Sequence, residues 1–116
     1  MNSLPVIVAR RHDAIHSELD IVVSADNPWF DGHFPGQPIL PGVVQIGWAV
    51  HFACELHGFD AYVTTLEQIK FRRPILPGAQ LTLHLMPEAS TRKLRYEYRD
   101  AELRYSSGTL QFGTAA

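Results

Sequence analysis

The sequence has a single cysteine, Cys54, among its 116 residues. One thiol excludes an internal disulfide and cannot supply a cysteine cluster for zinc. No apolar run is long enough for a membrane span. The apolar run in the first residues, MNSLPVIVARRHD, is too short for a secretory signal. The formal net charge of -2 gives no reason to expect nucleic acid as a partner. We therefore expect one cytoplasmic domain over residues 1–116.

One apolar segment, bounded by proline and glycine, predicts a single long helix. Pro41 suits the first helical position, because the N–H that proline lacks needs no partner there. His57 and Gly58 form a plausible end. Apolar residues cover nearly the whole circumference, which predicts a helix buried all round.

Only three polar residues interrupt this apolar helix. At about 100° per residue, Gly47, His51 and Glu55 lie on one stripe, whereas Gln45 lies roughly opposite Gly47. A polar stripe on a buried helix borders either solvent or a cavity, so the stripe is a candidate for function.

The rest of the chain favours strands, with β-branched residues and period-two alternation. The predicted strands cover residues 17–25, 62–73, 79–88, 93–100 and 102–114. Consecutive strands after one helix are typical of an antiparallel sheet packed on that helix, an α+β fold.

Two stretches rich in proline and glycine carry a resemblance to a known family. GHFPGQPILPGV (32–43) and KFRRPILPGAQL (70–81) resemble, in order and separation, the two recurrent stretches of the hotdog-fold 3-hydroxyacyl-[acyl carrier protein] dehydratases, the second in the strand after the helix. PGVVQIGWAVHFA is similar to the small dehydratases of aryl-polyene pathways. The resemblance implies an antiparallel sheet wrapped around one central helix, in a dimer whose sheets join.

The resemblance also implies a reaction, the loss of water from a 3-hydroxyacyl thioester on acyl carrier protein, and no cofactor. The reaction needs a base at C2, a donor to the thioester oxygen and an acid for the leaving hydroxyl. By resemblance His33 is the base and the backbone N–H of Gly42 is the donor. The substrate-binding positions that it implies are Phe34, Pro35, Gly36, Pro41 and Gly47.

The sequence departs from the family at Gly47, where the family carries the catalytic Glu or Asp. Four readings stay open. His51 takes over as the acid, or is instead a hydrogen-bonded core histidine. Glu55 helps from further along the helix. The chain is a weak enzyme or an acyl-binding relic. Finally, since sites in this family combine the histidine of one subunit with the acid of the other, the chain forms a heterodimer with a carboxylate-bearing paralogue, instead of a homodimer.

Arg72 and Arg73 are expected to be either ordinary strand-end charges or, with Arg10 and Arg11, a docking surface for an acidic carrier protein. No metal site is predicted, because the pairs His12/His16 and His51/Glu55 lack a third ligand. A hotdog thioesterase is the rival enzyme, although it usually needs a well-placed carboxylate.

Overall fold

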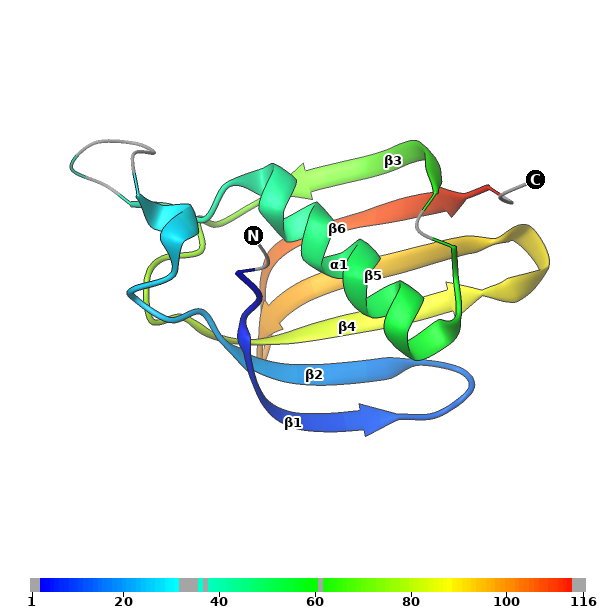
Figure 1. Ribbon diagram of the computed structural model, residues 1–116, viewed down its shortest axis with the longest axis horizontal. Helices are drawn as coiled ribbons and strands as arrows, with labels where there is room; N and C mark the ends of the chain where they lie inside the picture. The colour runs from blue at the N-terminus through cyan, green and yellow to red at the C-terminus, as the bar shows by residue number, and fades with distance from the viewer. Residues whose placement is uncertain (1–2, 32–35, 37, 61, 114–116) are drawn as a thin grey trace.

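Six strands form one antiparallel sheet that curls around one long helix in the part of the chain that the structure, a computed structural model, describes: residues 3–31, 36, 38–60 and 62–113 (Figure 1). The strands are β1 (Val6–His12), β2 (Ser17–Val22), β3 (Val63–Phe71), β4 (Gln80–Glu88), β5 (Lys93–Asp100) and β6 (Leu103–Phe112); the helix is α1 (Gly42–His57), and short 3-10 turns cover Pro28–Phe30 and Ala89–Thr91. The sheet order is β1-β2-β4-β5-β6-β3. This arrangement confirms the predicted α+β hotdog fold.

The core lies between α1 and the concave face of the sheet. The alternation predicted for β4 is confirmed, since Leu81, Leu83 and Leu85 are all buried. They belong to the same core cluster as Trp48 and Phe52 of α1. Each fully buried side chain of this size contributes roughly 1.5–3 kcal/mol relative to exposure. The sheet therefore holds the helix mainly by apolar contact.

The edge strand β1 was missed by the sequence analysis. It pairs only with β2, and its register shifts between Ile7 and Ala9. Val6 and Val8 are apolar yet 52% and 65% exposed, so the sequence lacks the alternation of apolar and polar residues that indicates a strand. An edge strand with one neighbour carries a weak sequence signal because little of it is buried.

The helix has the predicted length, but this chain alone does not bury it all round. It begins at Gly42, with Pro41 as the residue before the helix and not its first residue, and it ends before Gly58, which takes a left-handed conformation with φ of 71°. The sheet of this chain covers only one side of the helix, and Val43 is 75% exposed, so burial all round needs a second subunit on the other side. No helix in the described residues is both long and apolar enough to cross a membrane.

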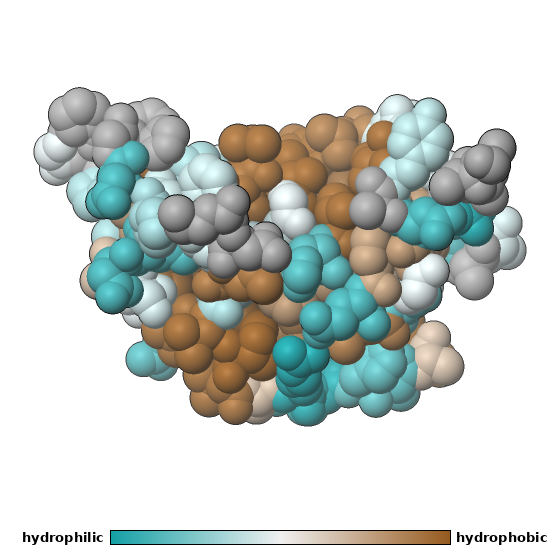
Figure 2. All heavy atoms as spheres, in the orientation of Figure 1, coloured by the Kyte–Doolittle hydropathy of each residue, from teal (hydrophilic) through white to brown (hydrophobic). Residues whose placement is uncertain are grey.

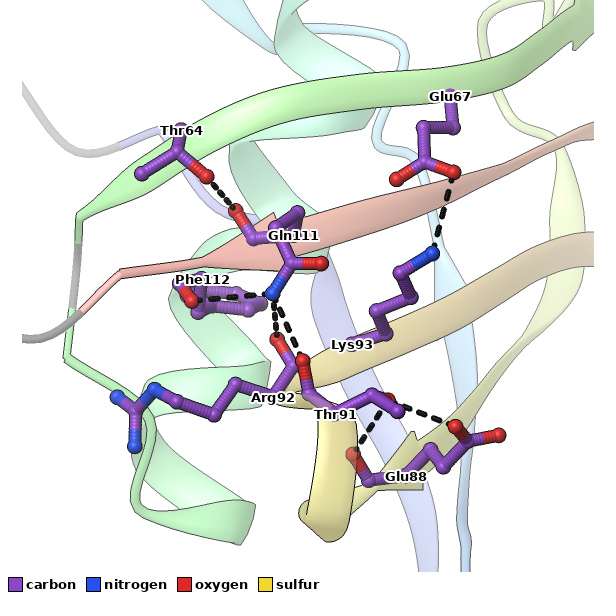
Figure 3. Close-up of polar contacts among 8 residues, drawn as sticks. All are labelled: Thr64, Glu67, Glu88, Thr91, Arg92, Lys93, Gln111 and Phe112. Carbon is purple, nitrogen blue, oxygen red and sulfur yellow. Dashed lines mark hydrogen bonds and ion pairs between the residues drawn. The ribbon is translucent and has the colours of Figure 1, made fainter.

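Polar contacts link neighbouring strands at the end of the sheet where β6 ends (Figure 3). The side-chain amide of Gln111 donates to the carbonyl of Thr91 at 2.8 Å, and the hydroxyl of Thr64 donates to the carbonyl of Gln111 at 3.3 Å. Lys93 pairs with Glu67 at 3.3 Å across β5 and β3. These contacts tie β3, β5 and β6 together far from the start of α1.

Candidate active site

The two proline-rich stretches meet in space just before the helix begins. The pentapeptide PILPG occurs in both, at 38–42 and 74–78. The backbone N–H of Leu40 donates to the carbonyl of Ile75 at 2.8 Å, and both side chains are buried. The second stretch spans the end of β3, the loop and the start of β4, in agreement with the predicted strands at 62–73 and 79–88. This pairing of loops fixes where α1 starts.

The start of α1 has no side-chain cap among the described residues, since Pro41 provides no side-chain hydrogen bond. In the described part of the chain, the backbone N–H groups of Gly42 and Val43 have no acceptor. Free N–H groups and the helix dipole make such an end attractive to negative charge. A Cβ at Gly42 would lie 2.5 Å from the ring of Phe71, so glycine is the residue that fits.

A groove of about 540 Å³, here called the helix-start groove, opens beside Gly42. It is lined by Ile39, Leu40, Pro41, Gly42, Val43, Gln45, Phe71, Arg72, Arg73 and Pro74. The backbone N–H groups of Arg72 and Arg73 donate to the carbonyl of Tyr105 at 2.8 and 3.1 Å, while both residues are exposed. The structure thus brings the two arginines next to the predicted oxyanion donor.

A second groove, the outer groove, runs over the exposed side of α1. It has a volume of about 350 Å³ and is lined by Ser3, Leu4, Trp29, Val43, Val44, Gly47, Trp48 and His51. No described atom lies within 4 Å of a Cβ added at Gly47. Packing within this chain therefore does not require glycine at position 47, and a larger side chain has room there.

The two polar residues that share the stripe with Gly47 lie on the same outer side of the helix. The side chain of His51 is 35% exposed and its Nε2 lies 3.7 Å from Oε2 of Glu55. His51 therefore lies on the side of the helix that the sheet of this chain leaves uncovered. Glu55 is held by Arg10 of β1 at 2.8 Å.

The predicted base and its neighbours cannot be placed. His33, Phe34 and Pro35 lie outside the described residues, and only Gly36, with φ of 84°, is described in that turn. The structure brings Pro41 and Gly42 together with the arginine pair, and Gly47 together with His51.

Sequence reasoning missed the role of Gln45, which looked like a mere interruption of the apolar helix. It is buried against the sheet, where its side chain donates to the carbonyl of Leu40 at 3.1 Å and accepts from the hydroxyl of Ser106 at 2.6 Å. The hydroxyl of Tyr98 donates to the backbone carbonyl of Gln45 at 2.6 Å, and burial raises the pKa of Tyr98 well above its usual value. These bonds fix the first turn of α1. The repeated PILPG was the one signal that could have indicated a shared loop structure.

Comparison with known proteins identifies the class to which this fold and groove belong. The family model described as ApeI-like, ApeI dehydratase, matches residues 9–109. A solved structure, the dehydratase heterocomplex ApeI:P from Xenorhabdus doucetiae, is 29% identical with a TM-score of 0.86, covering 98% of this chain and 100% of that chain. An uncharacterized protein from Erwinia carotovora subsp. atroseptica is 38% identical with a TM-score of 0.83, covering 95% and 96%. The chain belongs to the ApeI dehydratase family.

The chain is also similar, over part of its length, to curated dehydratase sequences. The 3-hydroxyacyl-[acyl-carrier-protein] dehydratase FabZ of Geobacter metallireducens is 36% identical over 72 residues, which are 54% of this chain and 48% of the relative. The FabZ of Pelotomaculum thermopropionicum is 40% identical over 80 residues, or 63% and 54%. The chain thus spans about half the length of the curated relatives that it matches.

Proposed function

We propose that this chain takes part in dehydrating a 3-hydroxyacyl thioester on acyl carrier protein to the trans-2-enoyl thioester. Its family and the names of its FabZ relatives support this reaction. The observation that carries the proposal is the uncapped start of α1, where the free N–H groups of Gly42 and Val43 open beside a groove that Arg72 and Arg73 border.

The proposed elimination assigns one task to each group. His33 takes the proton from C2, which histidine can do near neutral pH because its ordinary pKa is about 6.5. The thioester oxygen gains negative charge and accepts a hydrogen bond from the N–H of Gly42. The C2–H electron pair becomes the C2–C3 double bond, while the C3–O bond breaks and an acid protonates the departing hydroxyl. Water is the only leaving group, and no electrons are gained or lost.

We propose that a partner subunit supplies this acid. Gly47 has no carboxylate, and Glu55 is bound to Arg10. His51 lines the outer groove with Gly47 and is the alternative acid within this chain. The similar ApeI:P protein is a heterocomplex, which supports pairing with a carboxylate-bearing paralogue. In such a heterodimer, His33 of this chain would face the carboxylate of the partner and complete one site.

The surface that this partner would cover is an apolar seam along α1 and the edge strand β3. Its exposed members are Val43 at 75%, Leu66 at 49% and Phe71 at 53%. Figure 2 shows brown, apolar spheres gathered in the upper part of the view, where α1 and β3 lie in Figure 1. The edge of β3 is also free to extend the sheet, because β3 pairs only with β6. Joined sheets would bury this seam and the substrate together.

Acyl carrier protein, an acidic partner, would dock at the arginines beside the helix-start groove. Arg72 and Arg73 share a surface hollow with Arg104, Leu103 and Glu102 at the start of β6. Arg104 pairs with Glu97 at 3.8 Å, so Arg72 and Arg73 against Glu102 give this hollow the positive balance that would steer an acidic protein. The thioester would then enter past Phe34, Pro35, Gly36 and Pro41, and we expect the reaction in the cytoplasm.

Mass spectrometry of a 3-hydroxyacyl thioester on acyl carrier protein tests the proposal. We expect loss of one water when the chain is mixed with a paralogous subunit that carries the carboxylate, and much slower loss with the chain alone. His33→Ala in this chain should abolish dehydration by the mixture of the two subunits. Unchanged turnover by that variant would contradict the role of His33, and release of free thiol instead of enoyl product would favour a thioesterase.

A substitution at Gly47 distinguishes a chain that lacks only the catalytic acid from a chain that has lost dehydratase activity for other reasons. Gly47→Glu should raise dehydration by the chain alone by about 100-fold, the lower end of general acid catalysis. Gly47→Gln is the matched control, since it has the same shape but cannot give up a proton. Equal rates for both variants, in folded protein, would show that the carboxylate is not what limits the reaction, and no activity in either would favour an acyl-binding subunit.

A further inference from the structure

Four of the six histidines of the chain gather at the end of the sheet where β1, β2 and β4 meet the end of α1. The rings of His12 and His57 lie edge to face at 5.0 Å, and those of His16 and His84 at 5.3 Å. This cluster lies at the opposite end of α1 from Gly42. The proposed reaction uses none of these side chains.

One buried hydroxyl joins two of the histidines. Ser17, at the start of β2, is completely buried. Its Oγ lies 2.6 Å from Nδ1 of His12 on β1 and 2.7 Å from Nε2 of His57, the last residue of α1. These two hydrogen bonds connect the edge strand, its neighbour and the helix end.

The hydrogen bonds to Ser17 limit how many of the two rings, His12 and His57, can be protonated at once. With both imidazoles neutral, one donates to Oγ and the serine hydroxyl donates to the other. When one ring is an imidazolium both hydrogen bonds are kept, because that ring donates to Oγ and the serine hydroxyl donates to the neutral ring. With two, both rings donate to Oγ, the buried hydroxyl proton loses its acceptors, and two positive charges face each other at 5.0 Å.

The surrounding charges decide how readily His57 is protonated. Burial lowers the pKa of His57 below its ordinary 6.5, the charges of His12 and His16 lower it too, and Asp13 opposes them. One carboxylate oxygen of Asp13 accepts from the backbone N–H groups of Ile15 and His16 at 2.7 and 2.9 Å and lies 3.7 Å from Nδ1 of His16. From β4, His84 faces His16. In the described residues no carboxylate forms an ion pair with His12 or His57, so Asp13 offsets only part of the cost of a second proton.

We propose that His12, Ser17 and His57 form a proton-sensitive clasp, which fastens β1 and β2 to the end of α1 while at most one of the two rings is charged and opens when both are charged. The direction of the effect follows from linkage. Because the folded state binds the proton of His57 less readily than the unfolded state, the stabilisation is complete above about pH 6.5 and is lost as the pH falls toward the folded pKa. The proposal is independent of the dehydratase reaction.

Thermal unfolding between about pH 8 and about pH 5, with NMR titration of the histidine rings, tests the clasp. We expect the ring of His57 to titrate below 6.5 and the Tm of the native chain to fall with pH. His57→Gln, which keeps a donor and an acceptor for Ser17 but takes up no proton, should remove at least half of that fall. His51→Gln, on the outer side of the same helix, should keep the whole fall.

A second measurement uses the native chain alone and therefore tests the clasp even if the His57→Gln variant does not fold. In the native chain, amide protection of β1 and of the last turn of α1 should drop below about pH 6 before that of β4 does. The clasp is wrong if His57 titrates at or above 6.5, or if a folded His57→Gln variant loses as much Tm as the native chain. Simultaneous loss of protection in β1 and β4 would also contradict it.

Discussion

Gln45 and Gly47 stand two residues apart on α1, yet they belong to opposite sides of the helix and to different kinds of structure. Gln45 faces the sheet, and each polar group of its side chain has a partner. Gly47 faces the outer groove, where nothing in the described part of the chain touches it. A polar residue on an apolar helix can thus be purely structural, while the position that we propose to bear on function is one that lacks a side chain.

Removing the inner amide should have the largest effect on stability. Gln45→Ala leaves the hydroxyl of Ser106 and the carbonyl of Leu40 without partners inside the core, so we expect a loss of about 2–4 kcal/mol in the free energy of unfolding. Urea unfolding measures it. Gln80→Ala, at an exposed glutamine, is the matched control and should change stability by less than about 0.5 kcal/mol. Equal losses of stability for the two variants would show that the hydrogen bonds of Gln45 to the sheet side contribute little.

The start of the helix should tolerate no side chain beside Phe71. Gly42→Ala places a methyl group 2.5 Å from the ring of Phe71, which should cost about 1–3 kcal/mol of stability and slow dehydration by moving the N–H donor. The double variant Gly42→Ala with Phe71→Leu should recover most of both losses, as urea unfolding and the enoyl assay would show. Stability unchanged in the single variant would mean that the half-exposed ring simply moves aside.

Two buried tyrosines of β5 offer a finer test of the inner side. Tyr98→Phe removes the hydrogen bond to the carbonyl of Gln45 and should cost about 1 kcal/mol. Tyr96→Phe is the matched control, because the hydroxyl of Tyr96 has no partner in the described residues, and burial raises its pKa to about 12. This control should be neutral or stabilising in calorimetry. The opposite ranking would show that the bond to Gln45 contributes little.

The outer side should give the smallest change, and of the opposite sign. Gly47→Ala meets no atom and gains helix propensity, so we expect a stabilisation of about 0.5–1 kcal/mol in urea unfolding. A destabilised variant would show that position 47 is more tightly packed than the outer groove suggests, and would weaken the case for a carboxylate there.

Several parts of the fold were predictable because they depend on local pattern. The alternation in KLRYEYRD predicted β5 at its observed bounds, Lys93–Asp100, and the apolar run before His57 and Gly58 predicted α1. The stripe of Gly47 and His51 followed from helical spacing alone, and both line the outer groove. By contrast, β1 has one neighbouring strand among the described residues and no fully buried side chain, so its sequence carries no clear alternation.

The helix, most of the strands, the family resemblance and the absence of a carboxylate at Gly47 could be read from residue types and their spacing along the chain. The strand order, the partners of Gln45 and the contact between the two PILPG loops became known from the folded structure alone. Tyr98 and Ser106 lie 53 and 61 residues from Gln45, and His57 lies 40 from Ser17. Side chains so far apart meet only when the sheet closes around the helix, and no local pattern records which of them will touch.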